Sequence, residues 1–139
     1  MAYTYTSGIG AVGSYQASGV PWITGSGADG LPAGSEDRIE FPFVTRTVTI
    51  INTDAAAGTG NDIRVHFNST GSGNVVGGEH FVPLTLDQQS IAMNVKCKEI
   101  FISMDATLGN VSGSYVVMAE LTDIQTQNMF ILTGSGLTD

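Results

Sequence analysis

The sequence has few charged residues, and most of them carry the same sign. Charged side chains make up 13% of the 139 residues, and 13 acidic against 5 basic residues give a net charge of −8. This balance argues against a nucleic-acid partner, because neutralising phosphates takes clustered Lys and Arg. No apolar run approaches the ~18 residues that a membrane span requires, and the first residues lack the basic and apolar regions of a secretory signal. We therefore expect neither nucleic acid nor a membrane as a partner.

Cysteine is nearly absent. The single Cys97 cannot form an internal disulfide, so the chain either folds in a reducing compartment or does not depend on redox cross-links. Lys96 and Lys98 flank this cysteine and would lower the pKa of an exposed thiol. The alternation of the surrounding residues points the Cys97 side chain inward, which predicts a buried structural cysteine.

Small and hydroxyl-bearing residues are abundant: the chain has 18 Gly, 15 Thr and 12 Ser. From Arg38 onward apolar residues alternate with polar ones in short runs separated by Gly, Asn and Ser, and no run has the helical period over three turns. This pattern predicts an all-β fold, an antiparallel β-sandwich or jelly-roll-like fold of seven to eight strands with almost no helix. The predicted inward positions are Ile63, Val65, Phe67, Ile91, Met93, Val95, Ile100, Ile102, Tyr115, Val117, Ala119 and Leu121.

The first 37 residues differ in composition from the rest. They hold eight of the glycines and no basic residue, a composition that resists helix formation. Flexible linkers rarely contain aromatic residues, but this segment does. We therefore predict an extended N-terminal arm (1–37) and a β-sandwich domain (38–139). The arm either covers its own domain or docks on a neighbouring subunit by strand addition. The candidate partner-binding residues are Tyr3, Tyr5, Tyr15, Trp22 and Ile23.

The motifs of catalysis and cofactor binding are weak or missing. Residues 8–13 match GxGxxG, but no strand precedes them and Gly and Pro prevent a following helix, so we expect no dinucleotide cofactor. The sequence has no GxSxG, HExxH or Walker A motif, and we expect no enzyme activity. The most plausible metal ligands lack metal-site spacing, so we expect no metal. These residues are Asp62, His66, Glu79, His80 and Cys97. On one face of a predicted strand, Asp62, Arg64 and His66 are expected to be exposed to solvent, with a local Asp–Arg pair.

Two stretches carry a resemblance to a known group of proteins. In the first, residues 15–26 (YQASGVPWITGS) lead into residues 39–46 (IEFPFVTR). In the second, residues 94–102 (NVKCKEIFI) accompany residues 117–122 (VMAELT). Together they resemble small virion structural proteins of tailed bacteriophages, and among these the head decoration, or cement, proteins.

The resemblance implies a non-enzymatic virion structural protein that binds the outer surface of a phage head and stabilises it. The implied partners are the major capsid protein and further copies of the chain, and the implied location is the capsid surface after synthesis in the host cytoplasm. The resemblance does not carry over individual binding residues. A receptor- or glycan-binding tail or fibre module is the alternative, and saccharide-dependent Tyr or Trp fluorescence would distinguish it.

Overall fold

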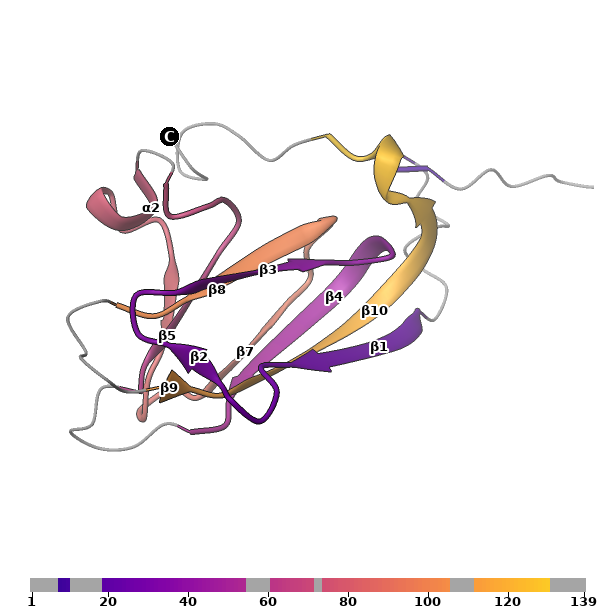
Figure 1. The fold of residues 1–139 in the computed structure, drawn as a ribbon. Helices are drawn as coiled ribbons and strands as arrows, with labels where there is room; N and C mark the ends of the chain where they lie inside the picture. The colour runs from indigo at the N-terminus through magenta and orange to yellow at the C-terminus, as the bar shows by residue number, and fades with distance from the viewer. Residues whose placement is uncertain (1–7, 11–18, 55–60, 72–73, 106–111, 131–139) are drawn as a thin grey trace, which may run out of the picture.

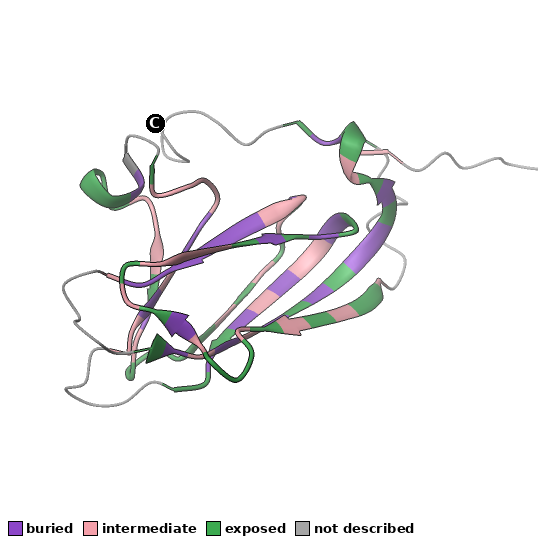
Figure 2. Cartoon of the chain, in the orientation of Figure 1, coloured by how far each residue is buried: buried purple, intermediate pink, exposed green. Residues whose placement is uncertain are grey.

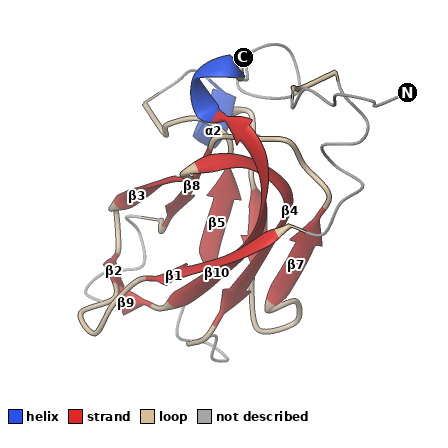
Figure 3. Cartoon of the chain, turned by 90° about the vertical axis from the view of Figure 1, so that its right-hand side faces the viewer, coloured by secondary structure: helices blue, strands red, loops and turns tan. Residues whose placement is uncertain are grey.

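The chain folds into antiparallel β-sheets with little helix, as the alternating sequence pattern predicts. The computed structural model describes residues 8–10, 19–54, 61–71, 74–105 and 112–130, and strands make up most of the drawn fold (Figure 3). In chain order its elements are β1 (Val20–Gly25), β2 (Leu31–Pro32), β3 (Glu36–Glu40), β4 (Phe43–Asn52), β5 (Ile63–His66), α2 (Asn74–Gly77), β6 (Val82–Leu84), β7 (Ser90–Met93), β8 (Glu99–Ser103), β9 (Ser112–Gly113), β10 (Tyr115–Gln125) and the 3-10 turn η2 (Thr126–Asn128).

The strands form three sheets within the described residues. One four-stranded sheet has the order β1-β10-β4-β7, another has the order β3-β8-β5-β6, and β2 pairs with β9. Every pairing is antiparallel. Figure 1 shows β1, β10 and β4 side by side, with β3 and β8 across the molecule from them. The all-β class is therefore confirmed.

A single main core receives the inner faces of both four-stranded sheets. Alternate residues of β10 and β4 are buried, which gives the banded colouring of these strands in Figure 2. Eight predicted inward residues are buried, namely Ile63, Val65, Ile100, Ile102, Tyr115, Val117, Ala119 and Leu121. The other four are partly buried and pack against the core: Phe67, Ile91, Met93 and Val95.

The ends of β4 and β10 support a second, smaller cluster. The register between these strands shifts after Glu120 and again before Gln125, so the buried positions on β10 change phase. Val44, Ile124 and Met129 are buried together there, and Ile9 packs against them. Irregular pairing thus lets two long strands bury side chains in two different places.

Residues before Arg38 form strands in the same sheets as the rest of the chain. β1 pairs with β10, and β3 spans the predicted boundary between residues 37 and 38. Where it is described, the predicted arm therefore pairs with strands of its own domain, and its docking on a neighbouring subunit stays a prediction. The Val20–Thr24 stretch has strand-forming residues, and β10 offers it a free edge.

The local sequence pattern and the structure differ at three places. Phe43 is 40% exposed, because the chain turns at Pro42 and Phe43 does not share the buried side of Ile39 and Phe41. Thr45 is fully buried, although alternation along β4 puts it opposite Val48 and Ile50. The apolar residues Met129 and Phe130 follow η2 and are not part of a strand. Among the described residues, no helix has the length and hydropathy for a membrane span.

Candidate functional site

The outward side of the β1-β10-β4-β7 sheet is almost free of ionisable side chains. Residues that pair directly across neighbouring strands lie on the same side of the sheet. Ile23, Met118 and Thr49 pair in this way and form a row across three strands. Glu120 stands at one end of this side, with its carboxylate 3.9 Å from the Arg46 guanidinium. We call the rest the uncharged face, which comprises Pro21, Ile23, Gly25, Thr47, Thr49, Ile51, Ser90, Ala92, Val116 and Met118.

Large apolar side chains on this face are accessible to solvent. Ile23 is 66% exposed, Met118 44% and Ile51 38%. They lie on three neighbouring strands, where Ile23 pairs with Met118 and Ile51 pairs with Val116. Contiguous exposed apolar patches on a soluble protein mark interaction sites more often than scattered single residues do.

The outward side of the other four-stranded sheet has the opposite character. Its charged residues are Glu36, Arg38, Glu40, Arg64 and Glu99, and the same side also carries the buried His66, Phe101 and Ser103. The Arg38 Nε donates a 2.7 Å hydrogen bond to a Glu99 carboxylate oxygen, and Arg38 also pairs with Glu40 at 3.1 Å. Exposed ion pairs of this kind keep a surface hydrated and contribute little to stability. The contrast between the two outward sides singles out the uncharged face as the candidate docking surface.

The structure separates the two predicted site residues that it describes. The Trp22 ring contacts the Phe41 ring edge-on, with centroids 5.2 Å apart, and packs against the main core. Ile23 points the other way and lies on the uncharged face beside Met118. Tyr3, Tyr5 and Tyr15 lie outside the described residues. Binding of a partner by these five residues stays a prediction.

Sequence reasoning missed Met118 and Ile51 as surface residues. The signal was present in the stretch from Tyr115 to Ala119, where both alternating sets of side chains are apolar. One set fills the core, and the other, Val116 and Met118, lies on the uncharged face. A strand that is apolar on both sides needs a packing partner on each side. The sequence alone does not show which of the two sides faces the core of its own domain.

The residues considered as metal ligands are not brought together. Within the described ranges, no group of three or more His, Cys, Asp or Glu side chains is placed to hold a metal ion. Cys97 is fully buried, and its Sγ lies 3.3 Å from the Thr45 hydroxyl. Burial raises the pKa of this thiol to about 11, which outweighs the hydrogen bond from Thr45. The prediction of a buried Cys97 is confirmed.

His66 does not face solvent, contrary to the prediction. It is 1% exposed and stacks on Phe101, with the rings 7° from parallel and their centroids 6.0 Å apart. The predicted Asp62–Arg64 pair is also replaced, because the Arg64 guanidinium contacts the Asp105 carboxylate at 2.6 Å. Both differences arise from β8, distant in sequence, which runs beside β5 and brings Phe101 and Asp105 to it.

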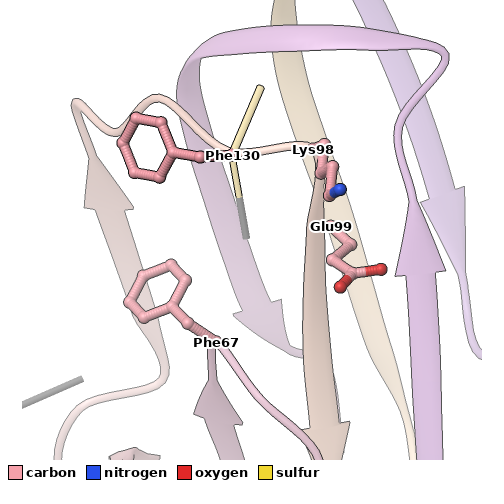
Figure 4. Close-up of a pocket in the computed structure, with 4 residues that line it drawn as sticks. All are labelled: Phe67, Lys98, Glu99 and Phe130. Atoms are coloured by element: carbon pink, nitrogen blue, oxygen red, sulfur yellow. The ribbon is translucent and has the colours of Figure 1, made fainter. Parts of the chain in front are cut away.

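The hollow between Phe67, Phe130, Lys98 and Glu99 is too small for a substrate (Figure 4). Its volume is about 10 Å³, room for one water molecule. A wider depression of about 300 Å³ includes Arg38, Glu40 and Glu99 in its lining, and these side chains already pair with one another. Neither presents an arrangement of catalytic groups.

No family model, no curated protein and no solved structure matches this chain.

Proposed function

We propose that the chain is a structural protein of a phage virion, a decoration protein that docks on the major capsid protein through the uncharged face. The finer architecture proposed is a β-sandwich, in which the docked sheet lies against the head and the charged sheet faces solvent. The observation that carries the proposal is the row of Ile23, Met118 and Thr49, of which Ile23 and Met118 are exposed and Thr49 is half-buried, on a chain of net charge −8. For an acidic chain, the desolvation cost of binding another protein is lowest where the contact surface carries no charge.

The size of the face favours a repeating shell over a single partner in solution. Strands lie ~4.8 Å apart and rise ~3.4 Å per residue, so four strands with four or five residues each present about 300 Å². Contact on one such face buries roughly 600 Å² in total, below the ~1,200–2,000 Å² of stable pairwise complexes. Docking on a lattice adds contacts to neighbouring subunits, and several weak contacts together give high occupancy. Further copies of this chain are the proposed neighbours.

The test is binding to phage heads assembled without this protein. The wild-type chain is mixed with expanded heads and sedimented, and the bound protein is counted per head. Ile23→Glu and Met118→Glu each place a carboxylate in the proposed interface and should lower the affinity by roughly ten-fold or more, because the charge is desolvated without a partner. Val76→Glu is the matched control. Val76 is 48% exposed, close to Met118 at 44%, and lies on α2, away from β1 and β10 (Figure 1).

The proposal is supported if the wild-type chain and the Val76→Glu control bind heads near-stoichiometrically and both interface variants do not. Absence of wild-type binding to heads would overturn the proposed function. Wild-type binding that survives both substitutions would leave head decoration standing and reject the uncharged face as its contact surface.

A further inference from the structure

A pocket lined by both polar and apolar residues lies on the charged sheet, on the opposite side of the molecule from the uncharged face. Its volume is about 210 Å³, and its lining comprises Gly34, Ser35, Arg64, Thr70, Val76, Ser103, Met104 and Asp105. At ~30 Å³ per water molecule, this is room for about seven waters, or for one small ring-shaped ligand. These residues come from β5, β8, α2 and the turns beside them, so the pocket exists only in the folded chain.

The hydroxyl proton of Ser103 is directed away from the pocket. The His66 Nδ1 lies 2.6 Å from the backbone oxygen of Asn68, an atom that can only accept, so Nδ1 carries the proton. Burial lowers the pKa of His66 against the opposing influence of Glu36, which keeps the ring neutral at pH 7. The neutral Nε2 is then an acceptor and takes the proton of the Ser103 hydroxyl at 2.8 Å. The Ser103 hydroxyl proton is therefore engaged, and any further hydrogen bond of this oxygen is one that it accepts.

Thr70 is arranged in the same way. Its hydroxyl donates a 2.5 Å hydrogen bond to a Glu36 carboxylate oxygen, which also accepts the Thr70 backbone N–H at 2.7 Å. The Asp105 carboxylate adds further acceptor positions, since a carboxylate has about four. Three residues of the pocket lining, Ser103, Thr70 and Asp105, thus have side-chain oxygens that can only accept a further hydrogen bond.

Arg64 is the charged donor in this lining. Its guanidinium contacts the Asp105 carboxylate at 2.6 Å and lies 4.6 Å from the centre of the Phe81 ring, which holds it in place. The charges of Arg64 and Asp105 cancel, so the pair selects neither a cation nor an anion. Its forked N–H groups and the neighbouring carboxylate match two adjacent hydroxyls of a ligand, one accepting and one donating.

We infer that this pocket binds a neutral polyhydroxylated ring, a hexopyranose, whose hydroxyls donate to Ser103, Thr70 and Asp105 and accept from Arg64. The apolar side of the sugar ring lies against Val76 and Met104. A ligand of this size with this many polar contacts has a dissociation constant on the order of 1 mM. This inference does not depend on the proposed function, because it concerns the other sheet.

The experiment uses the isolated full-length chain and free sugars, without phage heads. Saturation-transfer NMR is recorded with glucose, galactose and mannose up to tens of millimolar, and sugar-induced amide shifts are mapped on the labelled protein. We expect a saturable signal for at least one sugar, with shifts centred on Ser35, Thr70 and Ser103. Asp105→Asn should weaken binding by roughly ten-fold, because it replaces a doubly accepting group and leaves Arg64 without its counter-charge.

Arg38→Gln is the control, since Arg38 is an exposed ion-paired residue on the same sheet but outside this pocket. No saturable signal with any of the three sugars would overturn the inference. So would binding that Asp105→Asn leaves intact, or amide shifts that lie away from the pocket. If Asp105→Asn does not fold, the shift map of the wild-type chain decides. Because heads are absent from the assay, its failure leaves the proposed function untouched.

Discussion

Because the Cys97 thiol is buried, the stability of the fold should fall at alkaline pH. Burial raises the pKa of its thiol from 9.0 to about 11, so the unfolded chain loses this proton at a lower pH than the folded chain does. The folded state is then disfavoured as the pH rises through this window. The free energy of unfolding should fall by roughly 2–3 kcal/mol between pH 9 and pH 11 through this group alone.

The measurement is urea unfolding of wild type and Cys97→Ala between pH 8 and pH 11. The pKa of Tyr115 is also raised, by burial first and by its hydrogen bond to Asp37 second, so both proteins lose some stability at high pH. The difference between the two proteins isolates Cys97. Parallel pH curves for wild type and variant would contradict the prediction.

Thr45 stabilises the irregular stretch before β8 by hydrogen bonding inside the core. Its hydroxyl donates to the Val95 carbonyl at 2.7 Å and accepts the Cys97 N–H at 3.1 Å. Thr45→Val keeps the shape and leaves both backbone groups buried without this partner, so it should cost about 1–3 kcal/mol. Thr47→Val is the control on the uncharged face and should change stability by less than about 0.5 kcal/mol. Equal effects in chemical denaturation would contradict this role of Thr45.

At the scale of single residues, alternation predicts on which side of a strand a side chain lies. It does not predict which other part of the chain packs on that side. Ile63 and Val65 were correctly predicted to be buried. His66 was wrongly predicted to be exposed, because Phe101 and Ser103 reach it from a strand that is distant in sequence. Pairing between distant strands supplies these contacts, and local periodicity contains no information about it.

At the scale of elements, β1 protects the edge of β10. Five of its residues pair with Leu121 through Val117, and Trp22 adds its ring to the core beside Phe41. A chain that begins at Glu36 should therefore lose stability or fail to fold, since one side of β10 and part of the core become exposed to water. Trp22→Ala is the milder test and should cost about 2–4 kcal/mol, below the range for a fully buried tryptophan.

Ile23→Ala is the control for Trp22→Ala, because Ile23 lies on the same strand but faces outward. Its cost should be small in thermal or chemical unfolding. If a chain that starts at Glu36 had wild-type stability, β1 would contribute nothing to the stability of the sheet. That result would also restore the idea that the whole segment up to residue 37 is an arm that serves another subunit.

The sequence predicted the elements that are rich in β-branched and other apolar residues. β5 alternates strictly, whereas β8 and the first half of β10 carry apolar residues on both sides. β1 and β2 were not predicted as strands, because Gly19 before β1, Gly25 within β1 and Pro32 within β2 are residues typical of turns. Short edge strands take much of their stability from the partner strand, so their own composition is a weak guide. For the same reason, Ile23 is the one residue of the uncharged face that the sequence singled out as a candidate partner-binding residue.

At the scale of the whole molecule, charge is distributed unevenly between the two outward sides. With a net charge of −8, copies of the chain repel one another, which disfavours contact through their charged surfaces. The uncharged face is where such copies, or a capsid subunit, can approach without desolvating ions. Docking there depends on apolar contact, whereas docking on the charged sheet would depend on ion pairs.

Ionic strength distinguishes these two ways of docking. At 0.15 M salt the screening length is about 8 Å, and at 1 M it is about 3 Å, so raising salt weakens contacts made by exposed charges. Binding of the wild-type chain to heads should change by less than about two-fold between these concentrations. It should become somewhat stronger in sulfate, since excluded salts favour burial of apolar surface. Arg38→Gln serves as the control and should show the same salt response, because Arg38 lies on the charged sheet. A fall in binding of ten-fold or more at high salt would place the contact on the charged sheet, and the uncharged face would need another occupant.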